Sequence, residues 1–379
     1  MQSIFIKITF LLIQLPVATI NNNLCKSIKL DKPRISIMGS AISTTQFYLY
    51  GRKHFRQPGY LENVKHYKDP VQECANIGLN QAGSDGVRLQ DKVVVITGSN
   101  SGIGKELATY AAAKGAKLFM VCRSEKRALE ARTEILESIK SDPNVDANNV
   151  QVLLCDLGET KEVRRLVKEI QGKTPKVDVL VCNAGVLLND RQETSDGNEV
   201  TFATHLLCGS YMLSTLLIPQ LEAAGEEARV VFVSSGGMYP NPFPNWEKAV
   251  GKQGYEGNAQ YSYAKRGQVL LAETYAKKYA SISWLSAHPG WTATPAVDLA
   301  YGSQAKYLEP MRTPWQGAEG IAWLMSAPKA QLESGAFYLD RSPQRKHLSG
   351  PFFTEGSYTK NSQAEIDEMM IRLKETAGL

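Results

Sequence analysis

The stretch Thr97-Gly-Ser-Asn-Ser-Gly-Ile-Gly104 decides the fold. An apolar, β-branched run at 93–97 precedes it, and apolar spacing predicts a helix from about 103 to 114 after it. Glycines let the backbone approach a pyrophosphate, and the first N–H groups of a helix bind anions. The spacing Gly-x-x-x-Gly-x-Gly differs from the commoner G-x-G-x-x-G, so the strand and helix around it carry the argument. The residues expected to contact a dinucleotide here are Gly98, Ser99, Asn100, Ser101, Gly102, Ile103 and Gly104.

Strands and helices are predicted to alternate along the rest of the chain. Further strands are expected at 117–121, 150–154, 177–181, 229–234 and 282–287, and helices at 125–139, 159–171, 199–217, 261–280 and 314–326. Such alternation predicts an α/β fold with a single doubly wound parallel sheet of the Rossmann type. We assign residues 89–345 to this α/β domain, 1–44 to a leader or unordered segment, 45–88 to an accessory arm and 346–379 to a tail with a helix at 363–377.

Charge is distributed unevenly over the 379 residues. The chain carries a net charge of +5, and its first 88 residues hold eleven Lys and Arg against five Asp and Glu. The remaining body is almost neutral, which argues against a nucleic acid as partner. Aromatic and basic residues are mixed between 46 and 67, which fits either an interfacial helix with peripheral membrane contact or a helix packed on the body. Pro58-Gly59 is expected to divide this segment into two pieces.

The start of the chain allows several interpretations. Residues 1–20 are apolar, but the uninterrupted run is short for a membrane span of ~20 residues and resembles the core of a signal peptide. Met38-Gly-Ser-Ala-Ile-Ser43 fits an N-myristoylation pattern if translation begins at Met38. None of the six cysteines has C-x-x-C spacing, and no metal site is predicted. We expect Cys122, Cys155 and Cys182 to be buried thiols, which favours an intracellular, reducing compartment.

Arg123 points to the identity of the dinucleotide. An NAD(H) site usually has an acidic residue at the end of the second strand, whereas an Arg suits the 2′-phosphate of NADP(H). Residues 121–124 contain no Asp or Glu, so NADP(H) is favoured over NAD(H). After the third strand, Asp156 can accept a hydrogen bond from the adenine amino group. A solvated arginine and a turn aspartate are the alternative interpretations.

Tyr261-x-x-x-Lys265 predicts the site of hydride transfer. On a helix these two side chains share a face, and the ammonium is expected to lower the pKa of the phenol so that it can act as a general acid or base. Ser235, at a predicted strand end 26 residues before Tyr261, can donate to a substrate oxygen. Tyr263 is the competing phenol, but Gly267 stands four residues after it.

Together these motifs resemble the short-chain dehydrogenases/reductases over roughly residues 89–339, and more narrowly the members similar to retinol dehydrogenases. The resemblance implies an alcohol/carbonyl oxidoreductase with a small, apolar substrate (a lipid, retinoid or steroid-like molecule) and homo-oligomers in some members. It also implies that Lys265 holds the nicotinamide ribose together with Tyr261. Further cofactor contacts implied by the matching positions are Leu157, Asn183, Ala184, Gly185, Pro289, Gly290, Trp291 and Thr292.

One position departs from that family. Its members usually carry F-x-x-N-x-x-G in the helix after the fourth strand, where the Asn supports a proton relay to Lys. Here Phe202-Ala-Thr-His-Leu-Leu-Cys-Gly209 is one residue longer and has no Asn, so His205 or Leu206 takes its place. A catalytically weak, nucleotide-binding pseudoenzyme or scaffold is therefore the alternative function. Sugar-nucleotide epimerases are disfavoured, because they usually show Gly-x-x-Gly-x-x-Gly.

Overall fold

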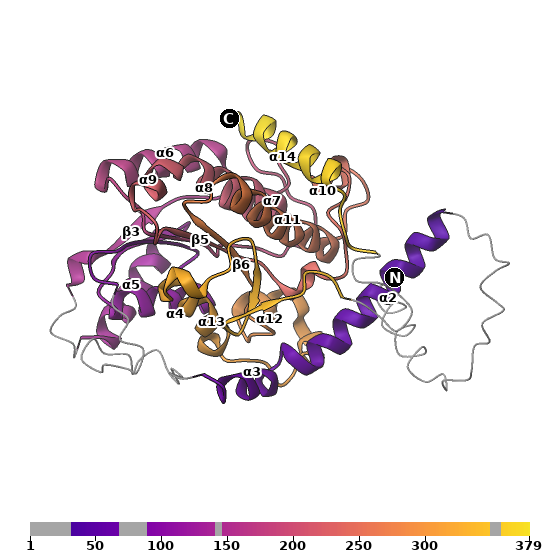
Figure 1. Cartoon of the computed structure of the whole chain (residues 1–379), viewed down its shortest axis with the longest axis horizontal. Coiled ribbons are helices and arrows are strands. Elements are labelled where there is room, and N and C mark those ends of the chain that lie inside the picture. The colour runs from indigo at the N-terminus through magenta and orange to yellow at the C-terminus, as the bar shows by residue number, and fades with distance from the viewer. Residues whose placement is uncertain (1–31, 68–88, 141–145, 349–357) are drawn as a thin grey trace.

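An eight-stranded sheet runs through the body of the molecule, with helices on both faces (Figure 1). The structure is a computed structural model that describes residues 32–67, 89–140, 146–348 and 358–379. Within these ranges, side chains are described from Ser43 onward, except those of residues 296, 299 and 300. Most of the expected leader, and the part of the arm at 68–88, therefore lie outside the described residues. So do the signal-peptide interpretation of residues 1–20 and the side chains of most of the myristoylation pattern.

The strand order is β3-β2-β1-β4-β5-β6-β7-β8. All neighbours pair in parallel except β7 and β8, which are antiparallel. The order reverses between β1 and β4, and in open α/β sheets ligands bind at this switch point, beyond the carboxyl ends of the strands. The predicted doubly wound sheet is confirmed, and β7 and β8 were not anticipated. The strands are β1 Val93–Thr97, β2 Lys117–Cys122, β3 Val150–Leu154, β4 Val179–Cys182, β5 Arg229–Val233, β6 Ser283–Ala287, β7 Phe337–Leu339 and β8 Ser342–Gln344.

Two helical layers cover the sheet. In Figure 1, α4, α5 and α13 lie below it, and α6, α7, α8 and α11 lie above it. The α-helices of the body are α4 Gly102–Ala113, α5 Glu125–Ser138, α6 Thr160–Lys173, α7 Val200–Phe202, α8 Leu213–Leu216, α9 Ile218–Ala223, α10 Trp246–Ala249, α11 Gly257–Lys278, α12 Pro295–Tyr301, α13 Pro314–Ser326 and α14 Gln363–Ala377. Short 3-10 turns are η3 Ala147–Asn149, η5 Gly236–Met238, η6 Gly302–Tyr307 and η7 Lys329–Gln331.

The helix expected at 199–217 is not a single α-helix. Its middle, η4 (Ala203–Met212), is a π-helix between α7 and α8. A π-helix bonds each N–H to the carbonyl five residues earlier, so it takes up one more residue per turn than an α-helix. This segment is the one that is a residue longer than the family pattern, and the π-helix accommodates that extra residue.

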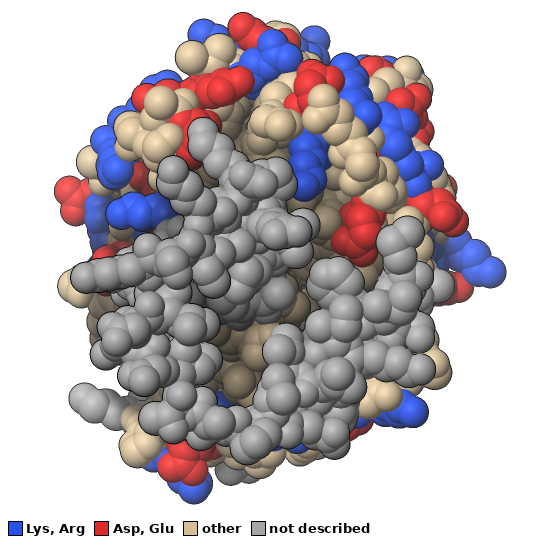
Figure 2. Space-filling model, turned by 90° about the vertical axis from the view of Figure 1, so that its right-hand side faces the viewer, with Lys and Arg blue, Asp and Glu red and all other residues tan. Residues whose placement is uncertain are grey.

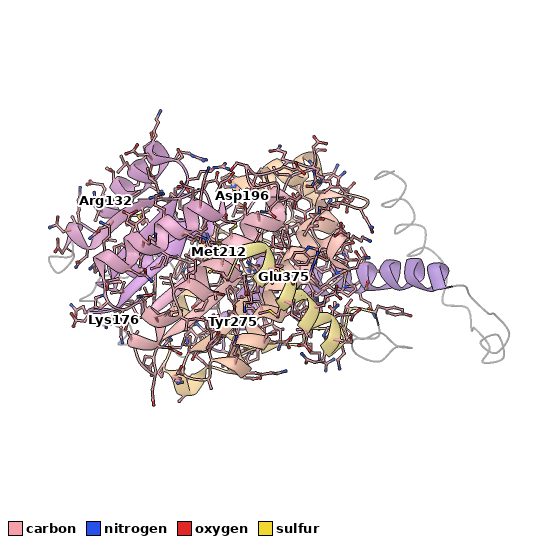
Figure 3. The ribbon with its side chains drawn as sticks, turned by 90° about the horizontal axis from the view of Figure 1, so that it is seen from above. Arg132, Lys176, Asp196, Met212, Tyr275 and Glu375 are labelled. Atoms are coloured by element: carbon pink, nitrogen blue, oxygen red, sulfur yellow. The ribbon has the colours of Figure 1, made fainter. Side chains whose placement is uncertain are left out.

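One apolar core lies on each side of the sheet. Because the parallel strands are covered on both faces, β1, β4, β5 and β6 are buried along their whole length. The upper core extends to the C-terminal helix, where Met369 and Leu373 of α14 are buried in the same cluster as Met212 and Tyr275. Figure 3 shows α14 (yellow) lying over the helix layer that carries Met212 and Tyr275. Helix α14 is thus part of the packed body.

The N-terminal arm forms two helices, α2 (Lys32–His54) and α3 (Gln57–Val64). The chain bends at residues 55 and 56, and Pro58 lies in the first turn of α3, where a missing N–H costs nothing. Phe55 and Tyr60 are buried against the body, so this part of the arm packs on it, while the other end of α2 projects away (Figures 1 and 3). On that side, basic and acidic side chains of the described residues are interspersed (Figure 2). Within the described ranges, no helix has the length and apolar character to cross a bilayer.

Candidate active site

A cleft of about 1580 Å³ opens at the carboxyl ends of the strands. It spans the switch point between β1 and β4, with the glycine loop after β1 at one end and Thr44 and Phe47 of α2 and the first residues of α12 near the other. Cavities for one drug-sized ligand measure about 300–1000 Å³. This cleft therefore has room for a dinucleotide together with a second small molecule.

The glycine loop turns tightly from β1 into α4. A Cβ added to Gly104 would lie 2.2 Å from the Gly98 carbonyl oxygen and 2.5 Å from Asn183 Nδ2, so only glycine fits there. Asn183 fixes the loop from the neighbouring strand, because its Nδ2 donates to the carbonyl oxygens of Thr97 (2.9 Å) and Gly98 (3.2 Å). The Ser101 side chain does not cap α4, which leaves the first N–H groups of this helix directed at the cleft. Such a terminus is suited to a phosphate.

Arg123 and Asp156 lie close together in the lining of the cleft, at the end that holds the glycine loop. Arg123 Nη1 is 3.8 Å from Asp156 Oδ2, and both side chains are well exposed and line the cleft. Asp156 also accepts the N–H of Gly158 (2.9 Å). A third charged residue, Arg127 of α5, lines the same wall one turn beyond Arg123. Sequence reasoning missed Arg127, although its four-residue spacing from Arg123 at the start of a predicted helix was a signal.

Tyr261, Lys265 and Ser235 meet at the middle of the cleft. Tyr261 and Lys265 lie one turn apart on α11, and Lys265 Nζ is 5.5 Å from the centre of the Tyr261 ring. Lys265 is buried and donates to the Val233 carbonyl oxygen at 2.7 Å. Ser235 follows β5, and its Oγ accepts the N–H of Gly237 at 3.0 Å, which leaves the hydroxyl proton available for its hydrogen bond with Tyr261. Ser234 ties the two elements together by donating to the Lys265 carbonyl oxygen (2.8 Å).

The protein groups shift both pKa values of the Tyr–Lys pair. Burial raises the pKa of Tyr261 to about 12, against a smaller lowering by its hydrogen bond with Ser235. Burial also lowers the pKa of Lys265 to about 7. The expectation from the sequence, that the ammonium lowers the phenol pKa, is therefore not met by the protein groups alone. The physical reason is that burial of Tyr261 disfavours its charged phenolate, and this outweighs the lowering of its pKa by the hydrogen bond with Ser235.

His205, rather than Leu206, faces the reaction centre. Its ring meets the Tyr261 ring edge-on, with 5.3 Å between centroids, whereas the Leu206 side chain packs toward Gly267 of α11. His205 Nε2 lies 2.7 Å from the Val186 carbonyl oxygen and 3.0 Å from its N–H, and the buried Nδ1 has no partner among the described residues. Burial and the charge of Lys265 hold the His205 pKa well below its usual range. His205 is thus a neutral, buried imidazole in the π-helix.

The structure brings almost all predicted site residues to the cleft. Ser99 is the exception, because its side chain is fully buried and its Oγ lies 3.4 Å from Cys122 Sγ. Cys122, Cys155, Cys182 and Cys208 are free, buried thiols. The predicted residues that line the cleft are Gly98, Asn100, Ser101, Gly102, Ile103, Gly104, Arg123, Asp156, Leu157, Asn183, Ala184, Gly185, Ser235, Tyr261, Lys265, Pro289, Gly290, Trp291 and Thr292.

Comparison with known proteins agrees with this geometry. The model of the family described as short chain dehydrogenase matches residues 92–301. This chain belongs to the short-chain dehydrogenase family. Dehydrogenase/reductase SDR family member 12 from Bos taurus and that from Homo sapiens are each 35% identical to it over 293 residues, covering 77% of this chain and 88% of theirs. Retinol dehydrogenase 12 from Bos taurus is 30% identical and covers 67% of this chain and 79% of its own.

Solved structures show the same fold. A short chain dehydrogenase from Escherichia coli CFT073, crystallised with NADPH, superposes with a TM-score of 0.53 at 20% identity, covering 67% of this chain and 98% of its own. The family resemblance based on the motifs, including its narrower likeness to retinol dehydrogenases, is therefore confirmed, and the chain is a member of an oxidoreductase family.

Proposed function

We propose that this protein is an NADP(H)-dependent oxidoreductase that interconverts an alcohol and a carbonyl on an apolar substrate. The observation that carries the proposal is the meeting of Tyr261, Lys265 and Ser235 beside a glycine loop that accepts no Cβ. The relatives include retinol dehydrogenases, whose names state an alcohol substrate. NADPH in the structurally similar E. coli protein is consistent with the same cofactor here.

The cleft fits a dinucleotide in its size and in its uncapped helix terminus. Residues 98–104 would hold the pyrophosphate, and Arg123 with Arg127 would neutralise a 2′-phosphate. Lys265 would bind the nicotinamide ribose. When bound, the cofactor supplies or takes up a hydride at its nicotinamide ring.

The protein's own residues handle the proton and the substrate oxygen. Ser235 orients that oxygen by donating its hydroxyl proton, and the Tyr261 phenol gives a proton to it during carbonyl reduction or removes one during alcohol oxidation. Lys265 is held against Tyr261 by Val233 and stabilises the phenolate that reduction leaves. The catalytic roles thus fall on Ser235, Tyr261 and Lys265.

Titration of the full chain with NADPH and with NADH, followed by nicotinamide fluorescence, tests the cofactor assignment. We expect NADPH to bind more tightly, and Arg123→Ala to reduce its advantage over NADH by about tenfold, since a hydrogen bond to a charged group contributes ~1.5–3 kcal/mol. Lys126→Ala is the matched control, because Lys126 lies three residues after Arg123, at the start of α5, and is not among the described residues that line the cleft. Equal affinities for the two nucleotides would remove the role of Arg123.

Measuring turnover on a panel of aldehydes and ketones then distinguishes an active oxidoreductase from a nucleotide-binding scaffold without catalytic activity. Reduction of at least one apolar carbonyl compound, at a rate that depends on Tyr261, is the expected result. NADPH binding without turnover of any member of the panel would favour a nucleotide-binding scaffold instead.

A further inference from the structure

The bend between α2 and α3 lies against the substrate end of the cleft. Phe55, in this bend, is fully buried, and its ring meets those of His288 and Trp291 edge-on with centroid distances of 4.4 and 5.8 Å. His288 and Trp291 flank the loop after β6, which lines the cleft. The arm therefore contributes to the same apolar cluster as this active-site loop, although it lies outside the residues matched by the family model.

Backbone hydrogen bonds fix the bend to that loop. The Phe55 carbonyl oxygen accepts both the N–H of Trp291 and Nε of Arg312 at 2.8 Å, and the His54 carbonyl oxygen accepts Nη2 of Arg312 at 2.8 Å. Arg312 is buried and paired with Asp340. A buried guanidinium must have its donors satisfied, and here the arm supplies two of the acceptors. The position of α2 over the cleft is thus set by specific polar contacts as well as by apolar packing.

The arm also contacts the loop that carries the catalytic serine. A Cβ added to Gly236 would lie 2.7 Å from the Phe55 ring, so the ring rests directly on the backbone after Ser235. Ser43 Oγ of α2 donates to the Pro240 carbonyl oxygen at 2.7 Å. Two loops of the cleft, one after β5 and one after β6, are therefore held against the same pair of helices.

Phe47 of α2 reaches the cleft itself. Its ring lies edge-on to Trp291 (6.2 Å between centroids) and beside Phe55 (6.0 Å), and it lines the cleft together with Thr44. The lining of the cleft as a whole is mainly apolar. Its apolar residues include Leu187, Pro242, Val297, Tyr301 and Leu308, beside polar ones such as Asn241, Lys248 and Gln304. Such a lining recognises a bulky hydrocarbon body through area buried from water rather than through paired polar groups.

We infer that α2 forms one wall of the substrate pocket and that Phe47 is a specificity-determining residue, selecting for a long or ring-containing apolar body on the alcohol or carbonyl substrate. This inference rests on the proposed function for the reaction, but the binding of an apolar molecule against Phe47 does not require turnover.

Steady-state kinetics of the full chain with hexanal, decanal and a fused-ring aldehyde test the inference. Phe47→Ala is expected to lower the kcat/KM of decanal relative to that of hexanal by about tenfold. This is the range in which one large contact in an apolar pocket discriminates between substrates. The affinity for NADPH should stay within about twofold. Leu49→Ala is the matched control, since Leu49 lies on the same helix with its side chain 56% exposed.

A binding measurement makes the test independent of catalysis. The wild type, Phe47→Ala and Leu49→Ala are titrated with decanol and with hexanol, and binding is followed by tryptophan fluorescence. We expect decanol to bind several-fold more weakly only to Phe47→Ala. Equal behaviour of the two variants in binding would overturn the role of Phe47, whether or not turnover is seen. If Phe47→Ala selectively loses decanol binding but the wild type shows no turnover, the role of α2 as a pocket wall is supported and the proposed reaction is contradicted.

Discussion

The dinucleotide end of the cleft is built from short, continuous pieces of chain, whereas the substrate end is assembled from segments as far apart in sequence as Phe47 and Trp291. At the first end, the site is formed by β1, the glycine loop and the start of α4, and the backbone geometry determines which residue types fit at each position. At the second, side chains from the arm, the loop after β5 and the region around α12 pack together. A substitution that disrupts the dinucleotide end should abolish nucleotide binding, whereas a substitution at the substrate end should change the selectivity among substrates.

Tyr261→Phe should give the largest effect and leave both ends of the cleft intact. The substitution keeps the ring but removes the proton that is transferred, so turnover should fall by about 10²–10⁴-fold, the usual contribution of a positioned acid or base. NADPH affinity, measured by fluorescence, should change by less than about threefold. Tyr263→Phe controls for loss of a phenol from the same helix. Comparable rates for the two variants would move the proton-transfer role away from Tyr261.

The difference between the two ends explains what the sequence could predict. The glycine loop and the Tyr–Lys pair are local patterns, since residues one turn or one tight bend apart meet wherever the rest of the chain goes. That Phe55 would rest on Gly236, or that α2 would face Trp291, depends on tertiary packing between distant segments. Composition between 46 and 67 fitted a membrane surface as well as a protein surface, and only the packed structure places Phe55 and Tyr60 against the body.

The π-helix shows a second limit. An extra residue between Phe202 and Gly209 was visible in the sequence, but periodicity alone left open whether His205 or Leu206 faced the reaction centre. The choice depends on how the helix absorbs the insertion, and a π-turn turns His205 toward Tyr261. In the same way, Ser99 belonged to the motif but turns inward to Cys122, a distinction that burial decides.

Gly104→Ala should break the dinucleotide end. The added Cβ would overlap the Gly98 carbonyl oxygen and crowd Asn183 Nδ2, so the loop must shift away from the position in which it can hold a phosphate. We expect NADPH and NADH affinity to fall together by about 100-fold, because the backbone N–H groups of the loop serve either nucleotide. Gly172→Ala, near the end of α6, controls for the loss of a glycine, because no atom of the described residues lies within 4 Å of the new Cβ. Unchanged nucleotide affinity in Gly104→Ala would place the phosphate elsewhere.

The pH dependence of the two reaction directions should differ. A Tyr261 pKa raised to about 12 keeps the phenol protonated at ordinary pH, which suits carbonyl reduction and disfavours alcohol oxidation. Reduction should therefore keep its proton donor between about pH 6 and 9 and decline only as Lys265, whose pKa burial lowers to about 7, loses the charge that stabilises the phenolate. Oxidation should rise by up to about tenfold per pH unit as the phenolate fraction grows. Initial rates in both directions with matched substrates measure this. A plateau of oxidation near pH 8 would mean that the pKa is lowered in the working site, as the motif alone predicts.

Substitution of His205 should give the smallest effect, because His205 contacts the Tyr261 ring and its expected role is to support Tyr261 and Lys265 rather than to act on the substrate. Its ring lies edge-on to Tyr261, and its buried Nδ1 has no partner in the part of the chain that the structure describes, so we expect a neutral imidazole that can hold or pass a proton. His205→Phe keeps a ring in the π-helix but removes both nitrogens, and we expect turnover to fall by about fivefold, well below the effect of losing the proton-transfer group itself. NADPH affinity should not change.

His205→Asn separates a polar role from a packing role. Asn restores a hydrogen-bonding side chain but fills less space, so turnover close to that of the wild type would show that polarity matters at this position. Because the pKa of His205 lies well below its usual range, the pH profile of His205→Asn should superpose on that of the wild type. If His205→Asn and His205→Phe lose turnover equally, the ring serves only to pack the π-helix against α11, and proton transfer at Tyr261 runs without it.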